Sequence, residues 1–331
     1  MIVHTGVGLL GFGGPDSAEA VAPFMRNLTG REPSDELCAR VWGNYQAIGG
    51  ASPLLGIARR IAVGLEDALQ RDGYEVPVEV GMAFWHPFVA DAVANLAESG
   101  CDRVIAMSLS PFESSAVSGA CRRALNAAAH DFGVAEVVEA PLVSKLAAFS
   151  AFFAEELCVA LQAFDATDHP LVVFSAHSLP LADLTEQDPY VAGLRDVAQR
   201  VVGASGLAAV GNDGGIEALL PGLDAFGSAT AGVPWLLAYQ SKGQRPGEWL
   251  GPDLNAVLDA VAKSGRVDVV VVCPIGFLTD HMETLFDLDI VAKEQARSLG
   301  LRFLRVGVPN DDARVISAMA EEIEALLGKD A

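Results

Sequence analysis

The sequence predicts an α/β fold in which two similar doubly wound domains, each built on a four-stranded parallel sheet, face a cleft. Short runs rich in β-branched residues alternate with longer amphipathic stretches along the chain, and this alternation is typical of parallel sheets with helices on both faces. The length of 331 residues exceeds what one ordinary core holds. The hydrophobic share of 51% supplies enough apolar surface for two cores.

Eight strands are predicted, and they divide into two sets of four. The first set covers 7–11, 76–82, 104–109 and 136–142, and the second covers 171–175, 235–239, 267–273 and 302–306. The clearest helices between them are predicted at 54–72, 87–99, 150–164, 191–203 and 254–264. Such domains bind ligands at the carboxyl ends of their strands, so we expect functional residues in the segments that follow the strands.

The boundary between the domains is predicted between residues 142 and 171. We assign 1–145 to an N-terminal domain and 146–331 to a C-terminal domain. Residues 208–232 are rich in Gly and Ala and show weak periodicity, which indicates a surface insertion in the second domain.

The chain is strongly acidic, with 43 acidic and 22 basic residues and a net charge of −21. Such a surface repels phosphate backbones and anionic lipid headgroups, which excludes nucleic acid as the main partner. The N-terminal residues lack a signal-peptide pattern, and the apolar stretch 269–278 falls short of the ~20 residues that span a membrane. Five well-separated cysteines without a CxxC pair are typical of a reduced protein. We therefore expect a cytoplasmic protein without stable membrane insertion.

The first candidate site is the segment 174–180, FSAHSLP, which follows a predicted buried strand. His177 lies at the carboxyl end of that strand, and imidazole can exchange protons near neutral pH or meet a metal ion. The alternative is a histidine that only caps the strand or bonds a nearby carbonyl group.

The second candidate site is the segment 273–287, where an apolar strand ends in a loop and opens a helix. Glu283 and Asp287 are four residues apart, so they share one helix face. Carboxylate oxygens on one face suit a hard divalent cation. The alternative is structural, because Asp280 and Glu283 have the spacing of a capping box.

The predicted first strand closes in the turn 11–15, GFGGP. This turn does not complete the GxGxxG pattern, because residue 16 is Asp. A backbone turn close to a ligand is therefore favoured over a nucleotide site.

Six motifs resemble, in the same order, those of the ferrochelatase family. They are GGPDS at 13–17, YQAIGGASPL at 45–54, WHPF at 85–88, SAHSLP at 175–180, YQS at 239–241 with WLGPD at 249–253, and GFLTDHMETL at 276–285. The resemblance covers nearly the whole chain, and it implies two Rossmann-like domains with a porphyrin cleft between them.

The resemblance also implies a reaction, the insertion of Fe(II) into a porphyrin with release of two pyrrole protons. His177 and Glu283 are then the catalytic residues, with Glu283 facing His177 across the cleft. His177, Glu283 and Asp287 are implied as the residues that meet the metal, with Asp287 on the path of iron delivery. A neutral imidazole beside a carboxylate is a reasonable proton acceptor for this reaction.

The segment 26–44 is short and polar, and it resembles the soluble enzymes that use coproporphyrin III. We therefore predict coproporphyrin III as the substrate and coproheme as the product. Arg31 and Ser52 are expected to bind propionate groups, since Arg pairs bidentately with carboxylates. Phe12, Tyr45 and Gln240 complete the predicted porphyrin-binding set.

Three departures from the family pattern leave alternatives open. Phe12 replaces a metal-binding Tyr of some relatives, and Val291 stands where a further acidic residue would extend the row from Asp287. No cysteine follows Cys273, so we expect no [2Fe–2S] cluster and no other permanently bound cofactor. The alternatives are a protoporphyrin IX ferrochelatase and a non-catalytic porphyrin- or haem-binding protein. A monomer is expected.

Overall fold

The computed structural model describes residues 4–115, 117–165, 167–205, 211–212, 232–243 and 245–328. The chain divides into two compact units. Unit 1 comprises Met1–Ala148, Leu278–Met282 and Pro309–Ala331, and unit 2 comprises Phe149–Phe277 and Glu283–Val308. The predicted division differs from this grouping at the C-terminus, because it places 309–331 in the second domain.

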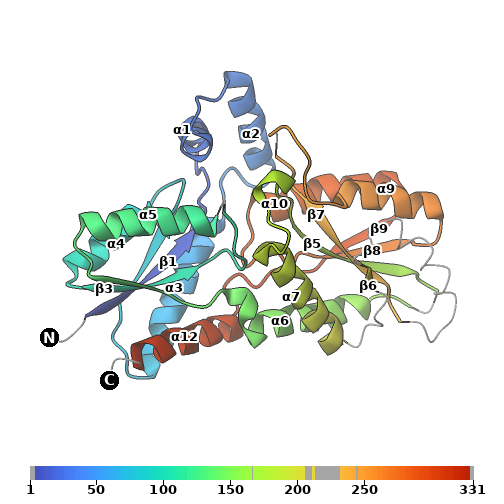
Figure 1. Cartoon of the computed structure of the whole chain (residues 1–331). Coiled ribbons are helices and arrows are strands. Elements are labelled where there is room, and N and C mark those ends of the chain that lie inside the picture. The colour runs from blue at the N-terminus through green and yellow to red at the C-terminus, as the bar shows by residue number, and fades with distance from the viewer. Residues whose placement is uncertain are drawn as a thin grey trace. The chain divides into compact units, whose positions relative to one another are not determined.

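Unit 1 is built on a parallel sheet with the strand order β2-β1-β3-β4. The strands are β1 (Thr5–Gly11), β2 (Val78–Met82), β3 (Arg103–Ser108) and β4 (Glu136–Glu139). Its helices are α1 (Ala18–Thr29), α2 (Asp35–Ala47), α3 (Leu54–Arg71), α4 (Val89–Glu98), α5 (Ser118–Asp131) and α12 (Ala313–Leu327), with a 3₁₀ turn η1 (Val143–Lys145). Helices α4 and α5 cover one face of the sheet, and α3 and α12 cover the other (Figure 1).

Helix α12 belongs to unit 1 because it packs on α3 and is tied to β3. A Cβ atom added at Gly64 would lie 2.9 Å from Cδ1 of Ile316, so the glycine allows the two helices to approach closely. The buried Arg103 of β3 donates to the carbonyl oxygen of Leu326 at 3.4 Å and pairs with Glu136 at 3.2 Å. The last helix therefore completes the first unit, although it follows the second in the chain.

Unit 2 is also built on a parallel sheet, with the strand order β6-β7-β5-β8-β9. The strands are β5 (Pro170–His177), β6 (Gly211–Asn212), β7 (Trp235–Gln240), β8 (Val269–Cys273) and β9 (Arg302–Arg305). Four of these are the predicted strands, and the two-residue β6 adds a fifth beside Trp235 and Leu236. The rest of the predicted insertion at 208–232 lies outside the described residues, except for Gly232.

The helices of unit 2 cover both faces of this sheet. They are α6 (Ala147–Leu161), which begins at the end of unit 1, α7 (Pro189–Ser205), α9 (Leu254–Ser264), α10 (Met282–Leu285), the π-helix η4 (Asp287–Ala292) and α11 (Lys293–Ser298), with a 3₁₀ turn η2 (Leu181–Asp183). Helix α9 lies on one face, and α6 and α7 lie on the other (Figure 1). All five residues of β8 are buried, which explains why the strand reads as a continuous apolar run.

The predicted fold class, an α/β protein with two doubly wound parallel sheets, is confirmed. The strands of both sheets alternate with helices along the chain, and every strand pair is parallel. Within the described ranges, no helix combines the length and the apolar character needed to cross a membrane.

Candidate active site

His177 is the last residue of β5, the central strand of the second sheet. The strand is buried from Leu171 to Ala176, and His177 is the first residue at this end that reaches solvent. Its register partner on the neighbouring strand is Gln240, the last residue of β7. Because parallel strands end at the same edge, the residues that follow β5, β7 and β8 gather here.

The turn after β8 crosses directly beside β5, and Gly276 makes this crossing possible. Its backbone N–H donates to the carbonyl oxygen of Ser175 at 3.0 Å. A Cβ atom at Gly276 would lie 2.6 Å from the Cα atom of Ala176, a distance that no side chain tolerates. The chain that continues into α10 is thereby brought next to His177.

The crossing places Glu283 of α10 in contact with His177. Nδ1 of His177 lies 2.9 Å from Oε2 of Glu283, and the two side chains are 32% and 28% exposed. We expected the two residues to face each other across a cleft, whereas they form a hydrogen-bonded pair within unit 2. The expectation failed because the sequence does not reveal how closely the turn at Gly276 approaches β5.

The carboxylate of Glu283 orients the imidazole ring. An ionised carboxylate cannot donate, so Nδ1 must carry the proton of this hydrogen bond. Nε2 has no protein partner in the part of the chain that the structure describes. Burial lowers the pKa of His177, but the charge and hydrogen bond of Glu283 and the charge of Asp287 together raise it above the ordinary value of 6.5. The pair therefore presents one ring nitrogen that can take up and release a proton near neutral pH.

Asp287, the first residue of η4, adds a third titratable group to this edge. Burial raises its pKa to about 6, and the charge of Glu283 acts in the same direction, while the hydrogen bond from Ser241 and the charge of His177 oppose the rise. The hydroxyl group of Ser241 donates to the carboxylate of Asp287. Ser241 was not among the site residues predicted from the sequence, although it lies two residues after a predicted strand, as His177 does.

Asp280 has a different role from its neighbours. Its backbone N–H donates to Oδ1 of Asn310 at 2.7 Å, and Nδ2 of Asn310 donates to Oδ2 of Asp280 at 2.8 Å. These bonds fasten the segment Leu278–Met282 to the start of the last segment of unit 1. Asp280 thus bonds Asn310 and Glu283 bonds His177, whereas the alternative left open by their spacing was a capping box.

Among the described residues, no three His, Cys, Asp or Glu side chains form a group that could hold a metal ion. His177, Glu283 and Asp287 thus do not make a closed three-ligand site in this conformation.

Two of the predicted porphyrin-binding residues come together in unit 1, around the turn that follows β1. A Cβ atom at Gly14 would lie 2.8 Å from Oγ of Ser52 and 3.5 Å from the hydroxyl of Tyr45. The backbone N–H of Ser52 donates to the carbonyl oxygen of Pro15 at 3.1 Å. The glycine thus lets Tyr45 and Ser52 close over the turn.

The other predicted porphyrin-binding residues have different surroundings. The ring of Phe12 packs edge-on against Phe84, with centroids 4.8 Å apart, and against Phe24 at 6.2 Å. Arg31 is exposed, and its guanidinium group makes no ion pair within the described ranges. Gln240 belongs to unit 2, where it is 4% exposed.

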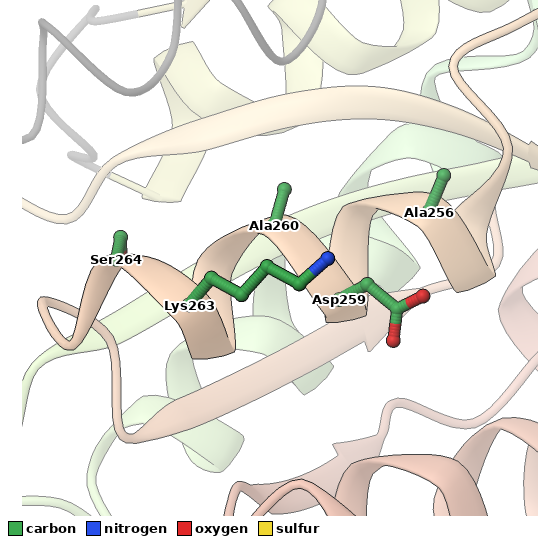
Figure 2. Close-up of a pocket in the computed structure, with 5 residues that line it drawn as sticks. All are labelled: Ala256, Asp259, Ala260, Lys263 and Ser264. Atoms are coloured by element: carbon green, nitrogen blue, oxygen red, sulfur yellow. The ribbon is translucent and has the colours of Figure 1, made fainter.

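Figure 2 shows a depression on the outer side of α9, lined by Ala256, Asp259, Ala260, Lys263 and Ser264. Its one carboxylate, Asp259, already accepts a hydrogen bond from Nε2 of Gln295 at 3.1 Å. The opposite side of α9 packs on the sheet through Val257 and Val261. The residues that line this depression include no histidine paired with a carboxylate, as His177 is with Glu283.

The two parallel sheets with helices on both faces define the class of the fold, an α/β architecture that is also found in solved chelatase structures. Among solved structures, the chain resembles SirB from Bacillus subtilis with Fe³⁺, with a TM-score of 0.56 and 9% identity over 99% of this chain and 97% of that one. The sirohydrochlorin chelatase SirB from Bacillus subtilis subspecies spizizenii in complex with cobalt aligns with a TM-score of 0.50, also at 9% identity, over 97% and 94% of the two chains. At this identity the similarity shows the fold alone.

The family follows from the sequence comparisons. The Ferrochelatase family profile matches residues 4–327, and the chain belongs to the ferrochelatase family. It is 32% identical to the coproporphyrin III ferrochelatase of Nocardia farcinica, over 96% of this chain and 88% of that protein. It is 29% identical to the ferrochelatase of Deinococcus radiodurans, over 96% and 95% of the two chains. The protein is therefore a metal-ion chelatase, a family in which Fe(II) is the substrate ion.

Proposed function

We propose that this enzyme inserts Fe(II) into coproporphyrin III to give coproheme and two protons. The observation that carries the proposal is the 2.9 Å contact between His177 Nδ1 and Glu283 Oε2, which leaves Nε2 without a protein partner in the described chain. Metal insertion must release two pyrrole protons, so an oriented proton acceptor is what the reaction requires.

In this proposal His177 and Glu283 are the catalytic residues. Nε2 of His177 takes up a pyrrole proton, and the ring becomes an imidazolium. The carboxylate of Glu283 stabilises this charge and keeps the ring in one orientation, because it already binds Nδ1. Asp287, whose pKa is raised to about 6, is close enough to influence His177 electrostatically and offers a second acceptor. The same three residues meet the incoming iron in turn.

The choice of coproporphyrin III rests on the short polar segment 26–44 and on a cation within it, Arg31. Coproporphyrin III carries four carboxylates, and a net charge of −21 disfavours such a ligand unless particular cations bind it. Arg31 is exposed and unpaired within the described residues, so its guanidinium is available to a propionate. Phe12, Tyr45, Ser52 and Gln240 complete the proposed porphyrin set. The relative from Nocardia farcinica bears the name of a coproporphyrin III enzyme, which supports this choice.

A porphyrin panel tests the proposal. Coproporphyrin III and protoporphyrin IX are each mixed with the enzyme, Fe(II) is added without oxygen, and the absorbance change gives kcat/KM. We expect coproporphyrin III to be preferred by about tenfold or more, the discrimination typical of a few differing contacts. A preference for protoporphyrin IX would favour the alternative substrate. Tight binding of both porphyrins without iron insertion would favour the non-catalytic alternative.

We further propose that the enzyme acts as a cytoplasmic monomer without a [2Fe–2S] cluster. The absence of a cluster is proposed from the cysteine pattern, since no cysteine follows Cys273 in the sequence. Iron and acid-labile sulfide in the purified protein should both be substoichiometric, and light scattering should give a mass near 34.6 kDa. A stoichiometric cluster or a stable dimer would contradict this part of the proposal.

A further inference from the structure

Each member of the His177–Glu283 pair has its own backbone carbonyl held by a buried side chain. The hydroxyl of Tyr190 donates to the carbonyl oxygen of His177 at 2.8 Å. Nε2 of Gln240 donates to the carbonyl oxygen of Glu283 at 2.7 Å. Tyr190 is 6% exposed and Gln240 is 4% exposed, so both bonds are shielded from competing water.

Tyr190 is itself fixed at the beginning of α7. The carboxylate of Asp188 accepts from the backbone N–H of Tyr190 at 3.0 Å and from that of Thr185 at 3.2 Å. Further along the helix, Leu194 and Val197 are fully buried. The phenol therefore reaches His177 from a rigid element, and its hydroxyl constrains the backbone at the end of β5.

Gln240 is fixed by the sheet. It is the register partner of His177 across β5 and β7, and its carbonyl oxygen accepts from the backbone N–H of Ser178 at 2.8 Å. Its Oε1 atom is buried and has no partner among the described residues. Rotating the amide would place Oε1 against the carbonyl oxygen of Glu283, and two acceptors repel each other. The contact with Glu283 thus fixes the orientation of the amide although its oxygen stays unsatisfied, which is a costly arrangement.

We propose that Tyr190 and Gln240 are positioning residues that hold His177 and Glu283 at hydrogen-bond distance before any substrate binds. The role in turnover rests on the proposed function, but the geometric role does not. A small displacement of either backbone would lengthen the contact between Nδ1 and Oε2, and a displacement of ~1 Å at a catalytic group can cost about 100-fold in rate.

The substitution Tyr190→Phe removes one hydroxyl and keeps the buried ring. Its matched control is Tyr74→Phe, which removes a hydroxyl from a residue of unit 1, whereas His177 and Glu283 belong to unit 2. We expect Tyr190→Phe to lower kcat about tenfold, with the KM values for porphyrin and iron unchanged. In the substrate-free protein at one fixed pH, the ¹⁵N resonances of the His177 ring should shift, because the hydrogen bond to Glu283 weakens. Tyr74→Phe should change neither quantity.

An unchanged His177 spectrum in Tyr190→Phe would overturn the proposal, whatever happens to the rate, because the hydrogen bond between His177 and Glu283 would then not depend on the Tyr190 hydroxyl. Gln240→Met provides an independent variant if Tyr190→Phe does not fold, and the same spectral shift with the same loss of kcat is expected. An unchanged spectrum in Gln240→Met would likewise overturn it. The variant His177→Ala separates the two proposals: wild-type iron insertion in His177→Ala refutes the catalytic role assigned to His177, while the spectra of Tyr190→Phe and Gln240→Met still decide the positioning role.

Discussion

The carboxyl edges of the two sheets carry different kinds of side chain. In unit 1 the turn after β1 contains Gly13 and Gly14, and it packs against the aromatic and hydroxyl groups of Tyr45 and Ser52. In unit 2 the same edge carries His177, in contact with a carboxylate. The same type of sheet therefore carries different side chains at its carboxyl edge in the two units. We infer that the edge of unit 1 binds the porphyrin and that the edge of unit 2 transfers protons.

The test with the largest expected effect removes His177 or Glu283, the acid–base pair of unit 2. His177→Ala or Glu283→Ala should lower kcat for iron insertion by about 100- to 10,000-fold, the range expected for loss of a general acid–base group. Porphyrin binding, measured by fluorescence quenching, should change little, because the comparison assigns binding to other residues. His130→Ala is the control, since that side chain is 89% exposed and its ring bonds Asp131 alone among the described residues. Wild-type turnover in both variants would rule out the assigned roles.

The second test disturbs the close approach between the turn at Gly276 and β5, which brings Glu283 into contact with His177. Gly276→Ala forces a Cβ atom to within 2.6 Å of Ala176, so β5 and the turn must separate. We expect a loss of about 1–3 kcal/mol in the free energy of unfolding, as for other overpacked sites, together with loss of activity. Gly203→Ala is the matched control, because nothing lies within 4 Å of its Cβ position. A Gly276→Ala variant as stable and active as wild type would show that the crossing does not depend on the glycine.

These two tests also mark what the sequence could and could not predict. The strands around His177 were predictable because they are buried on both faces and read as apolar runs, and the residue types at their ends pointed to proton chemistry. The contact between His177 and Glu283 was not predictable, since it depends on how a turn crosses a neighbouring strand. Helix α2 escaped prediction because Tyr45 is its only buried residue, which leaves almost no apolar periodicity. The return of α12 to unit 1 depends on contacts between residues more than two hundred positions apart, such as Arg103 with Leu326.

The third test uses pH. The pKa of Asp287 is about 6 in the folded protein, against an ordinary value of 3.8, so the folded state binds more protons between these values than the unfolded state does. The contribution of Asp287 to the free energy of unfolding is therefore fully present below about pH 4, and it is lost as the pH rises to 6. Asp287→Asn should raise the free energy of unfolding at pH 7.5 by roughly 1–2 kcal/mol and flatten its dependence on pH in this window. Urea unfolding at a series of pH values measures both effects. An unchanged pH profile would mean that the carboxylate is not destabilised by burial, and the proton-transfer edge would then consist of the His177–Glu283 pair alone.

The smallest expected effect concerns the binding side of the comparison. Arg31 is exposed and makes no ion pair within the described ranges, so Arg31→Ala should leave the melting temperature unchanged. Loss of one exposed propionate partner should raise KM for coproporphyrin III several-fold, corresponding to about 1 kcal/mol, with kcat preserved. The matched control is Arg59→Ala, which removes an exposed arginine of α3 in the same unit and should leave KM unchanged. A fall in kcat without a rise in KM would assign Arg31 to the chemical step, and the separation of binding from proton transfer between the two sheet edges would no longer hold.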